Sequence, residues 1–123
     1  MMIRAYAAGV VVLLITHGAW LVSIQSALYS TALLLVLWVS PVVASALVAY
    51  LAPQNKILLG TSIAVPAVLF ATAINFIYQV SGHEVDFPGF RGSVILALIM
   101  LAADDVLSAI GAALGYFLSR KSR

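Results

Sequence analysis

The sequence predicts an all-α fold, a four-helix transmembrane bundle formed by a single membrane domain over residues 1–123. Hydrophobic residues make up 64% of the chain and charged residues only 8%, whereas about 25% of the residues of a soluble domain are charged. The apolar residues fall into four runs, each with the about 20 residues that a helix needs to cross the hydrocarbon core. Five of the six lysines and arginines would lie on one side of such a bundle, which indicates that both termini are cytoplasmic.

The first two runs cover residues 5–23 and 31–52. Arg4, just before the first run, resembles the positively charged start of a secretory signal peptide. The apolar stretch, however, exceeds the usual length of about 7–15 residues, and no good A-x-A cleavage site follows it. We therefore expect this run to remain in the protein as a membrane span. The second run ends where Pro53, two amide residues and Lys56 indicate a tight turn.

The third and fourth runs cover residues 57–80 and 93–118, with a polar loop at 81–92 between them. Pro41 in the second run and Pro66 in the third each remove a backbone hydrogen bond from their helix. We expect both prolines to bend their helices, and the alternative is that they open a gap in the bundle.

The positions of the basic residues predict the orientation. With the N-terminus in the cytoplasm, Arg4, Lys56 and the basic tail at 120–123 are cytoplasmic, and only Arg91 is outside. We expect an integral protein of the cytoplasmic (inner) membrane of a bacterium, with the lipid bilayer as its immediate partner.

Several classes of function find no support in the sequence. The chain has no cysteine, which excludes disulfides, thiolate metal sites and cysteine nucleophiles. It contains no motif of hydrolases, zinc proteases or phosphate-binding loops, and no basic groove for nucleic acid. The loop residues His83, Glu84 and Asp86 match no metal-binding pattern, so we expect them to be solvated. We therefore expect no enzymatic activity, no cofactor, no metal and no nucleic-acid partner.

Two adjacent acidic residues are the strongest functional signal. Asp104 and Asp105 lie 11 and 12 positions after Ser93, near the middle of the fourth run. Each costs about 2.5–3.5 kcal/mol at the centre of a membrane helix, and the apolar residues of this run recover about 4–7 kcal/mol in total. The net free energy of inserting this run into the membrane is therefore close to zero, and we expect the acidic pair to face protein or a water-filled cavity. Two carboxyl groups this close in a poorly solvated place do not readily ionise together, so we expect at least one to stay protonated near neutral pH.

The spacing of small residues predicts how the fourth run packs. Asp104, Ser108, Gly111 and Gly115 share one helix face, and the G-x-x-x-G pair permits close approach of another helix. Asp105 is turned from that face by about 100°. The third run also has a strip of small residues ending in an amide, which we expect to pack against the glycine face, with substrate binding as the alternative. Its members are Gly60, Ala64, Ala67, Ala71 and Asn75.

His17 in the first run is a candidate partner for the acidic pair. Its height in the membrane differs from that of Asp104 by roughly 4–5 Å, which side chains can bridge. One interpretation is a proton relay or ion pair. The other is a structural role, in which His17 hydrogen-bonds to a backbone carbonyl or to Thr16.

Two functional hypotheses follow. The first is proton- or cation-coupled transport or conduction, in which Asp104 and Asp105 are the binding sites and His17 modulates them. Because four short helices enclose little volume, the pathway is expected to form between the subunits of a homo-oligomer. The alternative is an accessory or assembly subunit of a larger membrane complex, whose acidic pair docks a basic or amide side chain of a partner helix.

Overall fold

The chain is all-helical in the computed structural model, which describes residues 2–25, 31–82 and 84–121. Four helical segments are long and apolar enough to cross a membrane, as the sequence predicted: Met2–Ser23, Leu34–Leu51, Lys56–Val80 and Gly89–Lys121. The helices themselves are α1 (Met2–Gln25), α2 (Thr31–Leu51), α3 (Lys56–Thr61), α4 (Ala64–Val80) and α5 (Gly89–Lys121). The third candidate span thus consists of two helices, α3 and α4.

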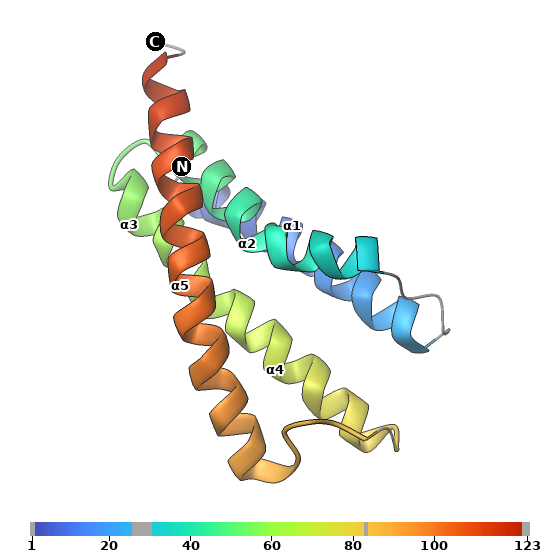
Figure 1. Cartoon of the computed structure of the whole chain (residues 1–123). Coiled ribbons are helices and arrows are strands. Elements are labelled where there is room, and N and C mark those ends of the chain that lie inside the picture. Colours follow the sequence, from blue (N-terminus) through green and yellow to red (C-terminus); the bar gives the residue numbers. More distant parts are fainter. Residues whose placement is uncertain (1, 26–30, 83, 122–123) are drawn as a thin grey trace.

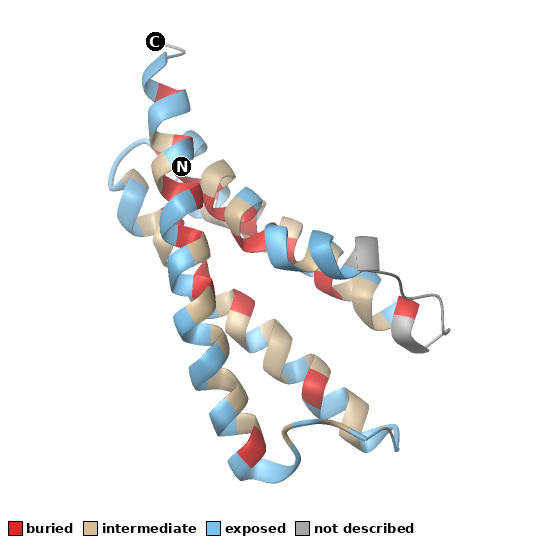
Figure 2. Cartoon of the chain, viewed as in Figure 1, coloured by how far each residue is buried: buried red, intermediate tan, exposed pale blue. Residues whose placement is uncertain are grey.

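The helices converge at one end and diverge at the other (Figure 1). Both termini lie at the converging end. Towards the opposite end, the pair α1 and α2 separates from the pair α4 and α5, so that the two pairs form a V. The longest helix, α5, has 33 residues and extends for about 50 Å at 1.5 Å per residue. Buried residues concentrate where the pairs cross (Figure 2).

A break near Pro66 divides the third span. Pro66 has no N–H for the carbonyl of Ser62, which would be its partner in a continuous helix. That carbonyl instead accepts the hydroxyl of Tyr6 on α1 at 3.1 Å and the backbone N–H of Val65 at 3.1 Å. The Ser62 carbonyl therefore keeps hydrogen-bond donors at the break, and leaving it unpaired in an apolar surrounding would be costly. The sequence predicted a bend at this proline, and the structure has an interruption.

The other internal proline, Pro41, leaves its helix continuous, since α2 runs unbroken from Thr31 to Leu51. The carbonyl that Pro41 cannot bond belongs to Leu37. It accepts the hydroxyl of Ser40 at 2.8 Å. A side chain next to the proline thus replaces the missing backbone donor.

The turn between α2 and α3 closes on a lysine. Asn55 has a φ of 53°, in the left-handed region, which asparagine tolerates better than most residues. The Lys56 ammonium donates to the carbonyls of Ala49 and Tyr50, each at 3.3 Å, and to that of Ala52. These are terminal carbonyls of α2, where a positive charge is favourable.

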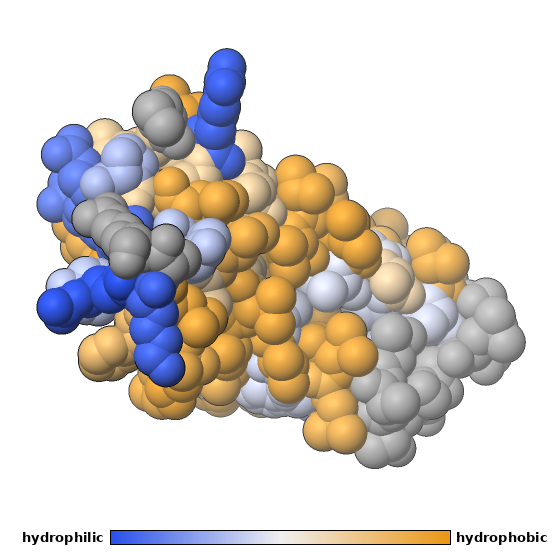
Figure 3. Space-filling view, turned by 90° about the horizontal axis from the view of Figure 1, so that it is seen from above, coloured by the Kyte–Doolittle hydropathy of each residue, from blue (hydrophilic) through white to orange (hydrophobic). Residues whose placement is uncertain are grey.

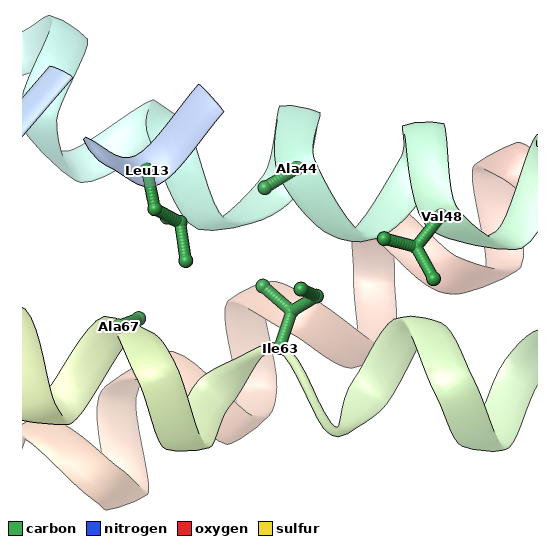
Figure 4. Close-up of a cluster of buried hydrophobic side chains, with 5 residues drawn as sticks. All are labelled: Leu13, Ala44, Val48, Ile63 and Ala67. Carbon is green, nitrogen blue, oxygen red and sulfur yellow. The ribbon is translucent and has the colours of Figure 1, made fainter. Parts of the chain in front are cut away.

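Small and branched side chains form the core at the crossing point. Figure 4 shows Ile63, at the break between α3 and α4, extending towards α2. The cluster consists of Leu13, Ala44, Val48, Ile63 and Ala67. Elsewhere large apolar side chains are exposed on every long helix, for example Ile3 at 85% and Phe90 at 85%. Seen from the converging end, hydrophilic side chains gather to one side and apolar ones cover most of the rest (Figure 3). This distribution is typical of a protein whose apolar surface faces lipid.

Glycines bring α5 against α2. A Cβ added to Gly111 would overlap the carbonyl of Val42 and the hydroxyl of Ser45, and one added to Gly115 would overlap the carbonyl of Ala46. The expectation that this face meets the third run is therefore wrong. The small side chains of α2 allow its backbone to approach the glycines.

Gly60, in the third run, packs on the neighbouring sector of α5. A Cβ added to it would lie 2.7 Å from the Cβ of Ala112.

Candidate functional site

A cavity of about 460 Å³ lies inside the V. Its walls come from α1 and α2 on one side and from α4 and α5 on the other, and residues 84–87 of the loop between α4 and α5 line it at the diverging end. Small-molecule sites in proteins typically have volumes of about 300–1,000 Å³. The cavity is therefore large enough for a drug-sized ligand.

Asp104 lines this cavity at its deepest point on α5. Leu96, Met100 and Asp104 line it at intervals of four residues, so they share one helix face. Asp104 is farthest from the loop, about 22 Å along the helix from Gly89 at 1.5 Å per residue. Its side chain is 2% exposed and has no hydrogen bond or ion pair with any described residue. A carboxyl group in that position requires solvation or a partner from the cavity.

Asp105 has the opposite environment. It is exposed on the outer surface of α5, between the exposed residues Ala102 and Ala109, and it does not line the cavity. The sequence predicted that the two carboxyl groups point in different directions, but also that both face protein or water. Because one residue along a helix is a rotation of about 100°, the walls that cover Asp104 leave Asp105 uncovered.

His17 lines the same cavity as Asp104 and is buried, but no hydrogen bond or ion pair joins the two among the described residues. Its Nδ1 lies 2.9 Å from the Leu13 carbonyl oxygen and 3.5 Å from the Thr16 hydroxyl. A carbonyl only accepts, so Nδ1 carries the proton in this bond and Nε2 of a neutral ring is an acceptor. The ring also contacts Phe70 of α4, with 5.8 Å between centroids. His17 therefore makes the carbonyl bond of the structural interpretation and also lies in the candidate site.

Two amides fix the loop at the diverging end. The Asn75 side chain, 9% exposed, donates from Nδ2 to the carbonyl of Phe87 at 3.2 Å. The Gln79 Oε1 accepts the backbone N–H of Gly89 at 2.8 Å, which satisfies one of the free donors at the start of α5. The sequence indicated a helix contact for Asn75 and no specific contact for Gln79. Both bonds depend on the path of the loop, which residue spacing does not reveal.

The other small residues of the sequence prediction lie at or below the floor of the cavity. Gly60, Ala64 and Ala67 are buried near the crossing point, and Ala71 lines the cavity. Ser108 lies one turn beyond Asp104, fully buried, and its hydroxyl has no hydrogen-bond partner among the described residues. Ser108, Gly111 and Gly115 do not line the cavity. The close contact of α5 with α2 therefore closes it towards the converging end.

The cavity lining is rich in aromatic and acidic side chains, which the sequence patterns did not predict. Both tryptophans of the chain, Trp20 and Trp38, line the cavity, together with Tyr78 and Phe87. So do three of the four acidic residues, Glu84, Asp86 and Asp104, but none of the lysines or arginines that the structure describes. These side chains come from four helices and a loop, so only the tertiary structure gathers them.

The described part of the chain contains no group of three or more histidines and carboxylates that could hold a metal. Of the predicted solvated loop group, Glu84 and Asp86 are exposed, and His83 lies outside the described residues. Comparisons of the chain with protein-family models, with curated proteins and with solved structures found no match. The functional argument therefore rests on the residues of the chain itself.

Proposed function

We propose that the chain spans a lipid bilayer with its four long helical segments and transports a proton or another cation, with Asp104 as the binding group. The observation that carries this proposal is a buried, unpartnered carboxyl group at the closed end of a cavity within one chain. An ionisable group at that depth in a membrane helix is costly, and such groups commonly mark ion pathways or proton relays.

The distribution of positive charge supports an orientation with both termini in the cytoplasm of a bacterium. Arg4, Lys56, Arg120 and Lys121 belong to the converging end by their place in the chain, and Arg91 belongs to the diverging end. The cavity would then open to the outside, and the contact of α5 with α2 would close it towards the cytoplasm. Transport requires that this contact separate, or that a second copy of the chain supply the inner half of the pathway.

The polar groups near Asp104 suit proton exchange. The buried hydroxyl of Ser108, one turn away on α5, is free to donate to a carboxylate or to accept from a carboxylic acid. His17 Nε2 is an acceptor in the neutral ring because Nδ1 is engaged by the Leu13 carbonyl. Asp104 is thus the site, and Ser108 and His17 are positioning or relay groups.

The test is proton flux into liposomes that contain the purified protein and an internal pH-sensitive dye. With a pH gradient and a membrane potential imposed, we expect proton flux above that of empty liposomes. In Asp104→Asn we expect this flux to fall at least about tenfold, because a loss of only about 1.4 kcal/mol in the free energy of proton binding corresponds to a tenfold change. Asp105→Asn makes the same chemical change one residue away, outside the cavity, and serves as the matched control. Wild-type flux in Asp104→Asn would refute the proposal.

A second candidate function is supported by Asp105. This side chain is exposed halfway along α5, among exposed apolar residues, where an uncompensated charge in a membrane costs about 2.5–3.5 kcal/mol. A partner helix with a basic or amide side chain would remove that cost, as an accessory subunit of a larger complex requires.

Extraction in native lipid, followed by measurement of the mass of the complex, tests this second function. A second protein lost in Asp105→Asn but retained in Asp104→Asn supports it. A wild-type chain extracted alone or as a homo-oligomer contradicts it.

A further inference from the structure

The lining of the cavity indicates which kind of cation the site takes. We propose that it binds an amphipathic organic cation, a molecule with a monovalent ammonium-type group on an aromatic or alkyl body. That this molecule is the transported substrate rests on the proposed function, whereas its binding does not.

The charges along the cavity select for a cation. Asp104 lies at the closed end, 2% exposed and without a partner, and Glu84 and Asp86 are exposed at the diverging end. No described lysine or arginine lines the cavity to balance them, although the chain as a whole has a formal charge of +2. The acidic groups therefore attract a cation to the opening and offer a counter-ion at the bottom, and they repel anions.

The aromatic residues select for an organic body. Trp20 and Trp38 come from α1 and α2, and Tyr78 and Phe87 come from α4 and the loop, so aromatic rings line both sides of the V. Aromatic faces attract quaternary and other weakly hydrated ammonium groups and also pack against apolar bodies.

A metal ion is a poor match for this site. Calcium and magnesium require six or more oxygen ligands at short distance, which these widely separated groups do not supply. A cavity of about 460 Å³ also has the volume of a small-molecule site.

Entry from the side is compatible with an amphipathic ligand. Trp38 is 45% exposed and Leu34 is 38% exposed, so the α2 wall of the cavity is partly open to whatever surrounds the chain. In a bilayer this surrounding is lipid, in which amphipathic cations accumulate near the interface.

Tryptophan fluorescence measures binding directly, because both tryptophans of the chain line the cavity. The protein is placed in lipid discs of phosphatidylglycerol, so that no lipid headgroup supplies a quaternary ammonium. Benzyltrimethylammonium is the probe, and neopentylbenzene, which has the same shape and no charge, is the control ligand. We expect a saturable change with the cation only.

The variants separate binding in the cavity from binding elsewhere. We expect the dissociation constant to rise at least about tenfold in Asp104→Asn, equivalent to about 1.4 kcal/mol, and to stay unchanged in Asp105→Asn. The double variant Glu84→Gln with Asp86→Asn alters only exposed loop residues and leaves the helices intact, so it tests the charge argument even if Asp104→Asn fails to fold. We expect it to weaken binding severalfold at low salt.

Three outcomes overturn the proposal: an equal saturable response to neopentylbenzene, wild-type affinity in both the Asp104 and the loop variants, or no saturable response of the wild type. None of these bears on proton flux, so the proposed transport function stands or falls separately. Repeating the titration in phosphatidylcholine discs identifies the source of the cation. Unchanged affinity supports a free organic cation as the ligand. Loss of binding would show instead that the choline headgroup of the lipid occupies the site.

Discussion

The contact between α5 and α2 offers the sharpest test of the fold, through the substitution Gly111→Ala. A Cβ on Gly111 would lie 2.9 Å from the carbonyl carbon of Val42 and nearer still to the carbonyl oxygen and to the hydroxyl of Ser45. The carbonyl atoms belong to the backbone of a packed helix and cannot rotate away. One added methyl group therefore forces α5 and α2 apart at the floor of the cavity.

Two opposing effects determine how much Gly111→Ala changes the free energy of unfolding. Overpacking of a buried contact costs about 1–3 kcal/mol, and replacing a glycine inside a helix by alanine regains about 0.5–1 kcal/mol. We therefore expect Gly111→Ala to lower the free energy of unfolding by about 1 kcal/mol. Gly18→Ala is the matched control, because Gly18 also lies inside a helix and an added Cβ there has no heavy atom within 4 Å.

The assay is unfolding in mixed micelles of a mild detergent and increasing sodium dodecyl sulfate, followed by helical circular dichroism. Gly111→Ala should unfold at a lower fraction of dodecyl sulfate than the wild type, and Gly18→Ala at the same fraction or a higher one. If Gly111→Ala is as stable as Gly18→Ala, the close contact of α5 with α2 is wrong.

Three further predictions use the same protein. Tyr6→Phe removes the hydroxyl donor at the break between α3 and α4 and should cost about 0.6 kcal/mol, the average for hydrogen bonds between membrane helices, in the same unfolding assay. Asn75→Ala removes the side-chain donor of the half-buried Phe87 carbonyl and should cost about 0.5–1.5 kcal/mol, with faster proteolysis of the loop as a second measurement. The chain has no cysteine, so Ser81→Cys and Gln54→Cys report topology: an impermeant maleimide on intact cells should label only the first, and the reverse pattern would invert the proposed orientation.

The sequence was sufficient for the helices because hydropathy is a local property. Each of the four predicted runs overlaps a helical segment that is long and apolar enough to cross a membrane, and polar or charged residues near Pro53 and Gly82 mark two of the turns. The effect of proline was less predictable. At the break near Pro66 the freed carbonyl bonds to Tyr6 of α1, whereas at Pro41 it bonds to Ser40 of the same helix, and local sequence does not reveal the first of these partners.

The candidate site depends on long-range packing, and the sequence identified only part of it. Asp104 and His17 stood out because ionisable residues are rare in apolar runs. Trp20 and Trp38 gave no such signal, since aromatic residues are common in membrane helices and these two line one cavity only through the pairing of α1 with α2. Spacing also could not reveal that Asp105 is left uncovered, because that depends on which helix occupies each sector around α5.

The exposure of Asp105 is hard to explain for a chain that acts alone. Asp105 stands halfway along α5, about 24 Å from either end at 1.5 Å per residue. Neither a tilt nor a shift of the helix brings it to the edge of a hydrocarbon layer about 30 Å thick without drawing apolar residues into water. A second copy of this chain offers no lysine or arginine within its apolar runs, and the amides of its third run, Asn75 and Gln79, already bond to the backbone that leads from α4 into α5. For the proposed accessory role, a different partner protein with a basic or amide side chain is therefore the better match, and because Asp104 lines the cavity, such a partner would not obstruct the proposed transport site.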